Sequence, residues 1–75
     1  MTNPLQEQIA GDHYKKLAIQ PIEFIVKNEI PFIEANIIKY ICRHRHKGGI
    51  TDLKKVIHYA ELAIEFYYKD HDRNK

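Results

Sequence analysis

The sequence predicts an all-α fold in which a short helix is followed by a helical hairpin. Isoleucine and the other apolar residues recur three and four positions apart, as in helices, and the alternation typical of strands is absent. Pro21, Pro31 and the Gly48-Gly49 pair stand where the patterned stretches begin or end. A chain of 75 residues has room for one small domain.

The first helix is expected to begin at Pro21, because a proline at the first helical position loses no hydrogen bond. It runs through Ile25 toward Glu29. Pro31 stops it, since a proline restricts the preceding residue, Ile30, to an extended conformation.

The second helix is expected to begin near Pro31 or Phe32 and to run to about His46, where Gly48 and Gly49 provide a flexible exit. One side of this helix carries side chains that bind phosphate. They are Asn36, Tyr40, Arg43 and Lys47, with Lys39 at the edge.

The other side of the second helix is apolar and includes Cys42, which is expected to be a buried, inert thiol. Residues 35–50 contain no Asp or Glu. A solvated helix face normally mixes acidic and basic side chains one turn apart. The imbalance therefore favours a bound anion over a plain solvated surface.

The third helix is expected to have Thr51 as its N-cap, to place Asp52 at the positive end of the helix dipole, and to continue to about Lys69. Apolar residues cover more than half of its circumference, whereas a surface helix needs an arc of only about 100°. They are Leu53, Val56, Ile57, Tyr59, Ala60, Leu62, Ala63, Ile64, Phe66 and Tyr67. Because one partner helix cannot cover this surface, we expect a homo-oligomer.

Residues 1–10 are expected to form a flexible arm, residues 11–70 a single helical domain, and residues 71–75 a tail. The net charge of +2 is too small to indicate nucleic acid by itself. The single cysteine excludes an internal disulfide, and the histidines lack the spacing of a metal site, so no metal ion or cofactor is expected. The chain shows no signal peptide or long apolar run, which predicts a cytoplasmic protein without a membrane partner.

The loop Asp12-His13-Tyr14-Lys15 has two interpretations, which the sequence leaves open. His13 and Lys15 could hold phosphate while Tyr14 stacks on a base. Alternatively, Asp12 caps a turn and Tyr14 packs onto the core.

Three residues of the third helix are further candidates. Asp52 either orients a cation of the second helix across the glycine turn or only caps its own helix. Lys55 and Tyr59 lie one turn apart, and either complete a pocket with Arg43 and Lys47 or border the oligomer interface.

Several short motifs follow one another in a fixed order. They are Asp12-His13-Tyr14, Gln20-Pro21, Asn36-x-x-Lys39-Tyr40-x-x-Arg43, Lys47-Gly48-Gly49 and Asp52-Leu53-x-Lys55, with Tyr59. Through them the chain closely resembles, over roughly residues 11–66, a small domain family of tailed phages. That family is catalogued as a domain of unknown function and is often labelled "nucleotide kinase". The resemblance implies a phage source, an all-helical oligomer, and a nucleotide ligand bound by residues 11–70 in the host cell cytoplasm.

The first hypothesis is a protein that sequesters a phosphate-rich small nucleotide, such as a cyclic dinucleotide signal of host antiviral defence. The chain is similar in size, charge layout and expected assembly to small phage oligomers that bind such signals. The expected roles are phosphate contact for Arg43 and Lys47, support from Lys39 and His13, stacking by Tyr14 or Tyr40, and recognition of a base edge or ribose hydroxyl by Asn36.

Two alternatives come from other functional classes. A nucleoside monophosphate kinase would move a phosphoryl group from ATP to a deoxynucleotide, which requires two nucleotide sites in line and therefore sites shared between subunits. No catalytic residue is assigned for it. A helical nucleic-acid or protein adaptor would place the basic face against its partner.

Overall fold

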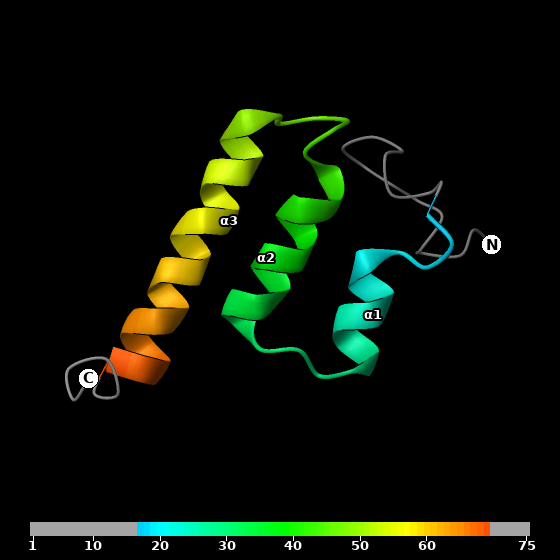
Figure 1. Cartoon of the computed structure of the whole chain (residues 1–75). Coiled ribbons are helices and arrows are strands. Elements are labelled where there is room, and N and C mark those ends of the chain that lie inside the picture. Colours follow the sequence, from blue (N-terminus) through cyan, green and yellow to red (C-terminus); the bar gives the residue numbers. More distant parts are fainter. Residues whose placement is uncertain (1–16, 70–75) are drawn as a thin grey trace.

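The computed structural model describes residues 17–69. This part contains helices α1 (Pro21–Lys27), α2 (Phe32–Arg43) and α3 (Ile50–Ala63), and α3 continues into the π-helical turn η2 (Ile64–Tyr68). Figure 1 shows α2 between α1 and α3. No strand occurs between residues 17 and 69, so the predicted all-α class and the helical hairpin are confirmed.

Helix α1 begins at Pro21, as predicted, but it ends at Lys27 and does not extend to Glu29. The end of the helix is closed by backbone hydrogen bonds from the N–H of Glu29 to the carbonyl of Val26 (3.1 Å) and from the N–H of Ile30 to the carbonyl of Ile25 (3.0 Å). This is a Schellman motif, which requires a left-handed residue after the cap. Glu29 has a φ of +52° and takes that position.

Helix α2 begins at Phe32, as expected, and ends at Arg43, before the predicted end at His46. The following turn closes on itself, because the N–H groups of His46 and Lys47 both donate to the carbonyl of Arg43, at 2.9 and 3.0 Å. Residues 44–49 therefore form the connection to α3.

The N-cap of α3 is Gly49 and not Thr51. Gly49 has a φ of +54° and a ψ of −134°, a conformation that side chains with a Cβ rarely adopt. The helix thus starts two residues earlier than predicted. Its far end is close to the prediction, because helical backbone reaches Lys69 through η2.

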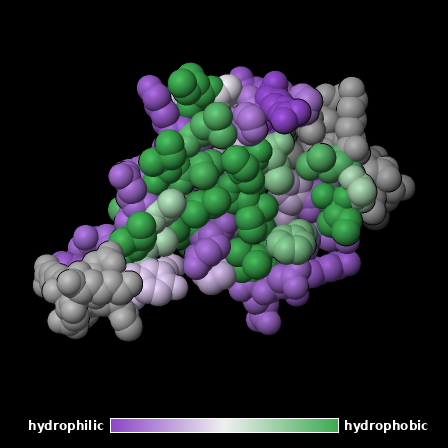
Figure 2. All heavy atoms as spheres, in the orientation of Figure 1, coloured by the Kyte–Doolittle hydropathy of each residue, from purple (hydrophilic) through white to green (hydrophobic). Residues whose placement is uncertain are grey.

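Most large apolar side chains of the described part are exposed to solvent. Among residues 17–69, the buried apolar side chains are those of Pro21 and Ile33. The exposed ones are Leu17, Ile19, Ile22, Phe24, Val26, Phe32, Ile41, Ile50, Ile57, Ile64, Phe66, Tyr67 and Tyr68. Figure 2 shows an extended apolar surface over α2 and α3 on the face in view.

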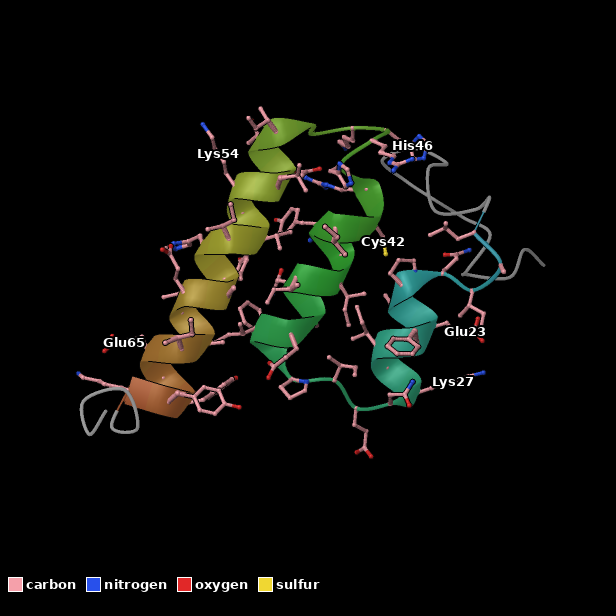
Figure 3. All side chains as sticks on the ribbon, in the orientation of Figure 1. Glu23, Lys27, Cys42, His46, Lys54 and Glu65 are labelled. Carbon is pink, nitrogen blue, oxygen red and sulfur yellow. The ribbon has the colours of Figure 1, made fainter. Side chains whose placement is uncertain are left out.

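The prediction of a buried Cys42 is wrong for this chain, because its thiol group is exposed. Cys42 points from α2 toward the side on which α1 lies (Figure 3), but among residues 17–69 the seven-residue α1 does not bury it. In the described residues, no helix has the length and apolar character needed to cross a membrane.

Candidate anion-binding site

An ion pair between Arg43 and Asp52 joins the end of α2 to the first turn of α3. The Nε of Arg43 donates to Oδ2 of Asp52 at 2.9 Å, and its Nη2 donates to Oδ1 at 3.1 Å. The side chain of Asp52 is 1% exposed and that of Arg43 is 17% exposed. Two of the five N–H groups of the guanidinium are thereby used, which fixes its direction.

Gly48 completes the shell of the Asp52 carboxylate. Its backbone N–H donates to Oδ2 of Asp52 at 3.0 Å. A Cβ at position 48 would overlap the atoms of that carboxylate. A residue without a side chain is therefore required here for a steric reason, and the carboxylate reaches back to the turn and does not cap α3.

These contacts set the protonation of Asp52. The hydrogen bonds from Arg43 hold the pKa of the Asp52 carboxyl below its ordinary value of 3.8. Burial acts in the opposite direction, while the charges of Arg43 and Lys55 and the N–H of Gly48 lower the pKa further. Asp52 is therefore a carboxylate at neutral pH, and the first interpretation of this residue, orientation of a cation across the turn, describes its geometry.

Three cations surround the ring of Tyr40, and we call them with this ring the cation cluster (Lys39, Arg43 and Lys55 around Tyr40). The Nζ of Lys39 lies 5.0 Å from the ring centroid, the Cζ of Arg43 4.7 Å, and the Nζ of Lys55 4.8 Å. All three distances lie within the range of cation–π contacts. The cluster combines side chains of α2 and α3. The fold thus brings Lys55 of α3 next to Lys39, Tyr40 and Arg43, which were predicted to share one side of the second helix.

An aromatic line continues from the cluster along α3. The rings of Tyr40 and Tyr59 are stacked with centroids 6.1 Å apart and planes at 14°. Phe32 meets Tyr59 edge-on at 6.5 Å. Asn36, Tyr40 and Arg43 of the predicted row are therefore partly buried in the seam between α2 and α3, whereas Lys39 is exposed.

The other predicted site residues are distributed as follows. Asn36 lies in the seam, and its side-chain amide donates to the carbonyl of Phe32 at 2.8 Å. Lys47 is exposed on the turn beside His46, which Figure 3 labels. His13, Tyr14 and Lys15 lie outside the described residues.

Two contacts were not predicted. Gly48 was expected in a flexible exit and in the Lys47-Gly48-Gly49 motif, but not as a donor to Asp52, although an acidic side chain in the first turn of a helix can accept from a backbone N–H just before it. The edge contact of Phe32 with Tyr59 also escaped notice, because nothing local links two residues on different helices.

Among known proteins, the chain matches the family model DUF3310, described as a protein of unknown function, from residue 3 to residue 61. The match covers most of the chain and includes all of α1, α2 and the part of α3 that carries the cluster. No curated protein and no solved structure gives a match. On the strength of the family match, the chain belongs to the DUF3310 family.

Proposed function

We propose that the chain binds a phosphate-rich small nucleotide at the cation cluster and sequesters it. The observation that carries this proposal is the convergence of Lys39, Arg43 and Lys55 on one ring, within 5.0 Å of its centroid. No two of these groups are more than 10 Å apart, because each lies within 5.0 Å of the same point. Their mutual repulsion falls when an anion with several charges binds between them.

Phosphate suits this arrangement chemically. Arg and Lys donate strong, charge-assisted hydrogen bonds to phosphate oxygens, and a pre-oriented guanidinium loses less freedom when it binds. Asp52 serves this purpose by positioning Arg43, and is not itself a ligand for an anion. Lys47 on the adjacent turn extends the basic surface, since residues 35–50 contain no acidic side chain.

The nucleotide class comes from the resemblance to phage domains labelled "nucleotide kinase". A phage protein in the host cytoplasm would encounter cyclic dinucleotide signals of antiviral defence, and these carry two phosphates. In the unliganded chain the ring of Tyr40 is engaged by cations and by Tyr59. We therefore assign Tyr40 the task of holding the cations, and leave base stacking to other aromatic side chains.

Binding is favoured over phosphoryl transfer because the proposal rests on one cation cluster, whereas transfer requires two nucleotide sites in line. Asp52 is the acidic residue in contact with the cluster, and both of its oxygens accept hydrogen bonds from Arg43 or Gly48. Asp52 therefore serves to position Arg43, and binding of one anion requires no more than this cluster.

The test is calorimetric titration of the full chain with ATP, deoxynucleoside monophosphates and a panel of cyclic dinucleotides. The informative variant is Lys39→Gln/Lys55→Gln, which removes two cluster cations. The control is Lys54→Gln, because Lys54 neighbours Lys55 but points away from α2 (Figure 3). We expect the double variant to weaken binding by roughly tenfold or more, as for lost hydrogen bonds between charged groups, and Lys54→Gln to bind as the parent does.

Three results would contradict the proposal. Equal affinities in the parent and the Lys39→Gln/Lys55→Gln variant would place the ligand elsewhere. New diphosphate in the reaction mixture would establish the kinase alternative. Tighter binding to DNA or RNA than to any nucleotide, with a steep loss of affinity as salt rises, would establish the adaptor alternative.

A further inference from the structure

Helix α3 carries a second surface, on the side away from the cation cluster. Ile50, Ile57 and Ile64 are seven residues apart and fall within about 40° of one another on a helix. Their side chains are 69%, 58% and 49% exposed. A seven-residue repeat of exposed isoleucines is the pattern of a helix that packs along another helix.

Two charged residues flank this stripe on one side. Lys54 and Glu61 are exposed, and both fall about 40–60° from Ile57 around the helix axis. Neither forms an ion pair within residues 17–69. The stripe therefore has an apolar centre and, on one flank, a positive end and a negative end.

We propose that a second copy of this chain covers the stripe, with the two α3 helices antiparallel about a two-fold axis at Ile57. In this arrangement Ile50 of one copy is level with Ile64 of the other, because each lies seven residues from the axis. Lys54 lies three residues before the axis and Glu61 four after it, so the two differ by one helical rise, about 1.5 Å. The pair forms twice, once on each side of the axis.

The charges select this orientation over the parallel one. In a parallel pair the flank that carries Lys54 and Glu61 would lie on opposite sides of the seam in the two copies, so these residues would form no opposite-charge pair with each other. The antiparallel pair sets opposite charges together and also opposes the two helix dipoles. The scarcity of buried apolar side chains within residues 17–69 supplies the driving force, since exposed isoleucines gain free energy when a partner covers them.

This inference does not rest on the proposed nucleotide site. Lys55 and Tyr59 lie on the side of α3 toward α2, whereas Ile57 lies on the opposite side. Loss of nucleotide binding and loss of self-association can thus be measured separately.

Charge reversal tests the orientation. By sedimentation equilibrium, the parent chain is expected to have at least twice the chain mass of 8.9 kDa. Lys54→Glu alone and Glu61→Lys alone each create two like-charge pairs, and we expect roughly tenfold or greater weakening of association. The double variant Lys54→Glu/Glu61→Lys restores the opposite pairs and should associate as the parent does.

Cysteine pairing gives an independent check in a Cys42→Ser background. Mixing Ile50→Cys with Ile64→Cys chains should give the mixed disulfide on oxidation, because the two positions are level. Ile50→Cys alone should not pair, since two copies of that position lie fourteen residues apart, about 21 Å along the helix. A monomeric parent, unchanged association in both single charge variants, or pairing of Ile50→Cys with itself and not with Ile64→Cys would overturn the proposal.

Discussion

The two sides of α3 are built on opposite principles. On the side toward α2, Asp52 is fully buried and its carboxylate oxygens accept three hydrogen bonds. On the opposite side, Ile57 is 58% exposed and lies between Ile50 and Ile64, which are 69% and 49% exposed. The chain therefore satisfies its polar groups internally and leaves much of its apolar surface for contacts beyond the described residues.

The interactions that fix the geometry of the hairpin differ from those that supply most of its stability. A buried ion pair adds little net stability, because desolvation offsets the attraction, but it penalises any register in which one partner is left alone. Apolar burial supplies most of the free energy of folding, and a chain this small has little to bury by itself. We infer that the Arg43–Asp52 pair fixes the geometry of the hairpin, while association provides much of its stability.

The largest loss of stability should come from Asp52→Asn, which removes the Arg43–Asp52 ion pair on the side of α3 toward α2. The substitution leaves the Arg43 guanidinium without its counter-ion in a mostly buried position. We expect the melting temperature to fall by roughly 10 °C or more, measured by circular dichroism.

The control for this variant is Glu65→Gln, which removes the same charge from an exposed pair with Lys69. Pairs of this kind contribute little, so its melting temperature should barely change. Equal melting temperatures for the two variants would show that the Arg43–Asp52 pair does not specify the hairpin.

Acidification should have the next largest effect, because it protonates the Asp52 carboxylate and weakens its attraction to Arg43. The folded-state pKa of Asp52 lies below 3.8, so between the two pKa values the unfolded chain binds more protons than the folded chain. This contribution to stability is therefore complete above about pH 4 and is lost as the pH falls through the lowered pKa. Melting curves of the parent and Asp52→Asn between pH 7 and pH 2 should converge in acid; parallel curves would contradict the assignment.

Substitutions in the glycine turn should have smaller effects on stability, and for different reasons at Gly48 and Gly49. Gly48→Ala places a Cβ on the Asp52 carboxylate, and we expect a loss of about 1–3 kcal/mol in the free energy of unfolding from overpacking. Gly49→Ala meets no atom within 4 Å, and its cost of about 1–2 kcal/mol comes from the positive φ alone.

A double-mutant cycle with Asp52→Ala distinguishes these two causes. In urea denaturation, the effect of Gly48→Ala should shrink once the carboxylate is gone. The effect of Gly49→Ala should stay the same. Additivity at both positions would show that no steric conflict with Asp52 exists.

The smallest predicted change in stability comes from a substitution outside α3, at Glu29 after the end of α1. Glu29 holds a φ of +52°, which favours glycine, so Glu29→Gly relieves local strain. The greater freedom of glycine in the unfolded chain offsets part of this gain. We expect a net stabilisation of about 0.5 kcal/mol in urea denaturation, whereas a loss would show that Glu29 contributes a contact that outweighs its backbone strain.

The sequence was sufficient for the features that local chemistry determines. The start of α1 at Pro21 and the start of α2 at Phe32 follow from proline geometry, and both were predicted. The end of α2 was not, because residues 44–46 continue a basic helical pattern while the turn is closed by contacts to Arg43. Contacts between residues far apart in the sequence, such as that of Phe32 with Tyr59, cannot be read from a local pattern.

The candidate site was foreseen in its composition but not in its arrangement. Lys39, Tyr40 and Arg43 were expected on one side of α2, facing a ligand. Tyr40 and Arg43 also contact α3, where Tyr59 stacks on Tyr40 and Asp52 pairs with Arg43. Nothing local in the sequence indicates these contacts, because their partners lie on another helix.

The most direct test of the central claim is an amide NMR titration of the full chain with ATP and, separately, with a cyclic dinucleotide. If the cation cluster binds the ligand, the largest shifts should occur at residues 39–43, at Gly48 and at residues 52–55. The amides of Glu61 and Ile64 should shift little. Absence of shifts with every nucleotide, or shifts concentrated on α1 or around Ile64, would contradict the assignment of the site.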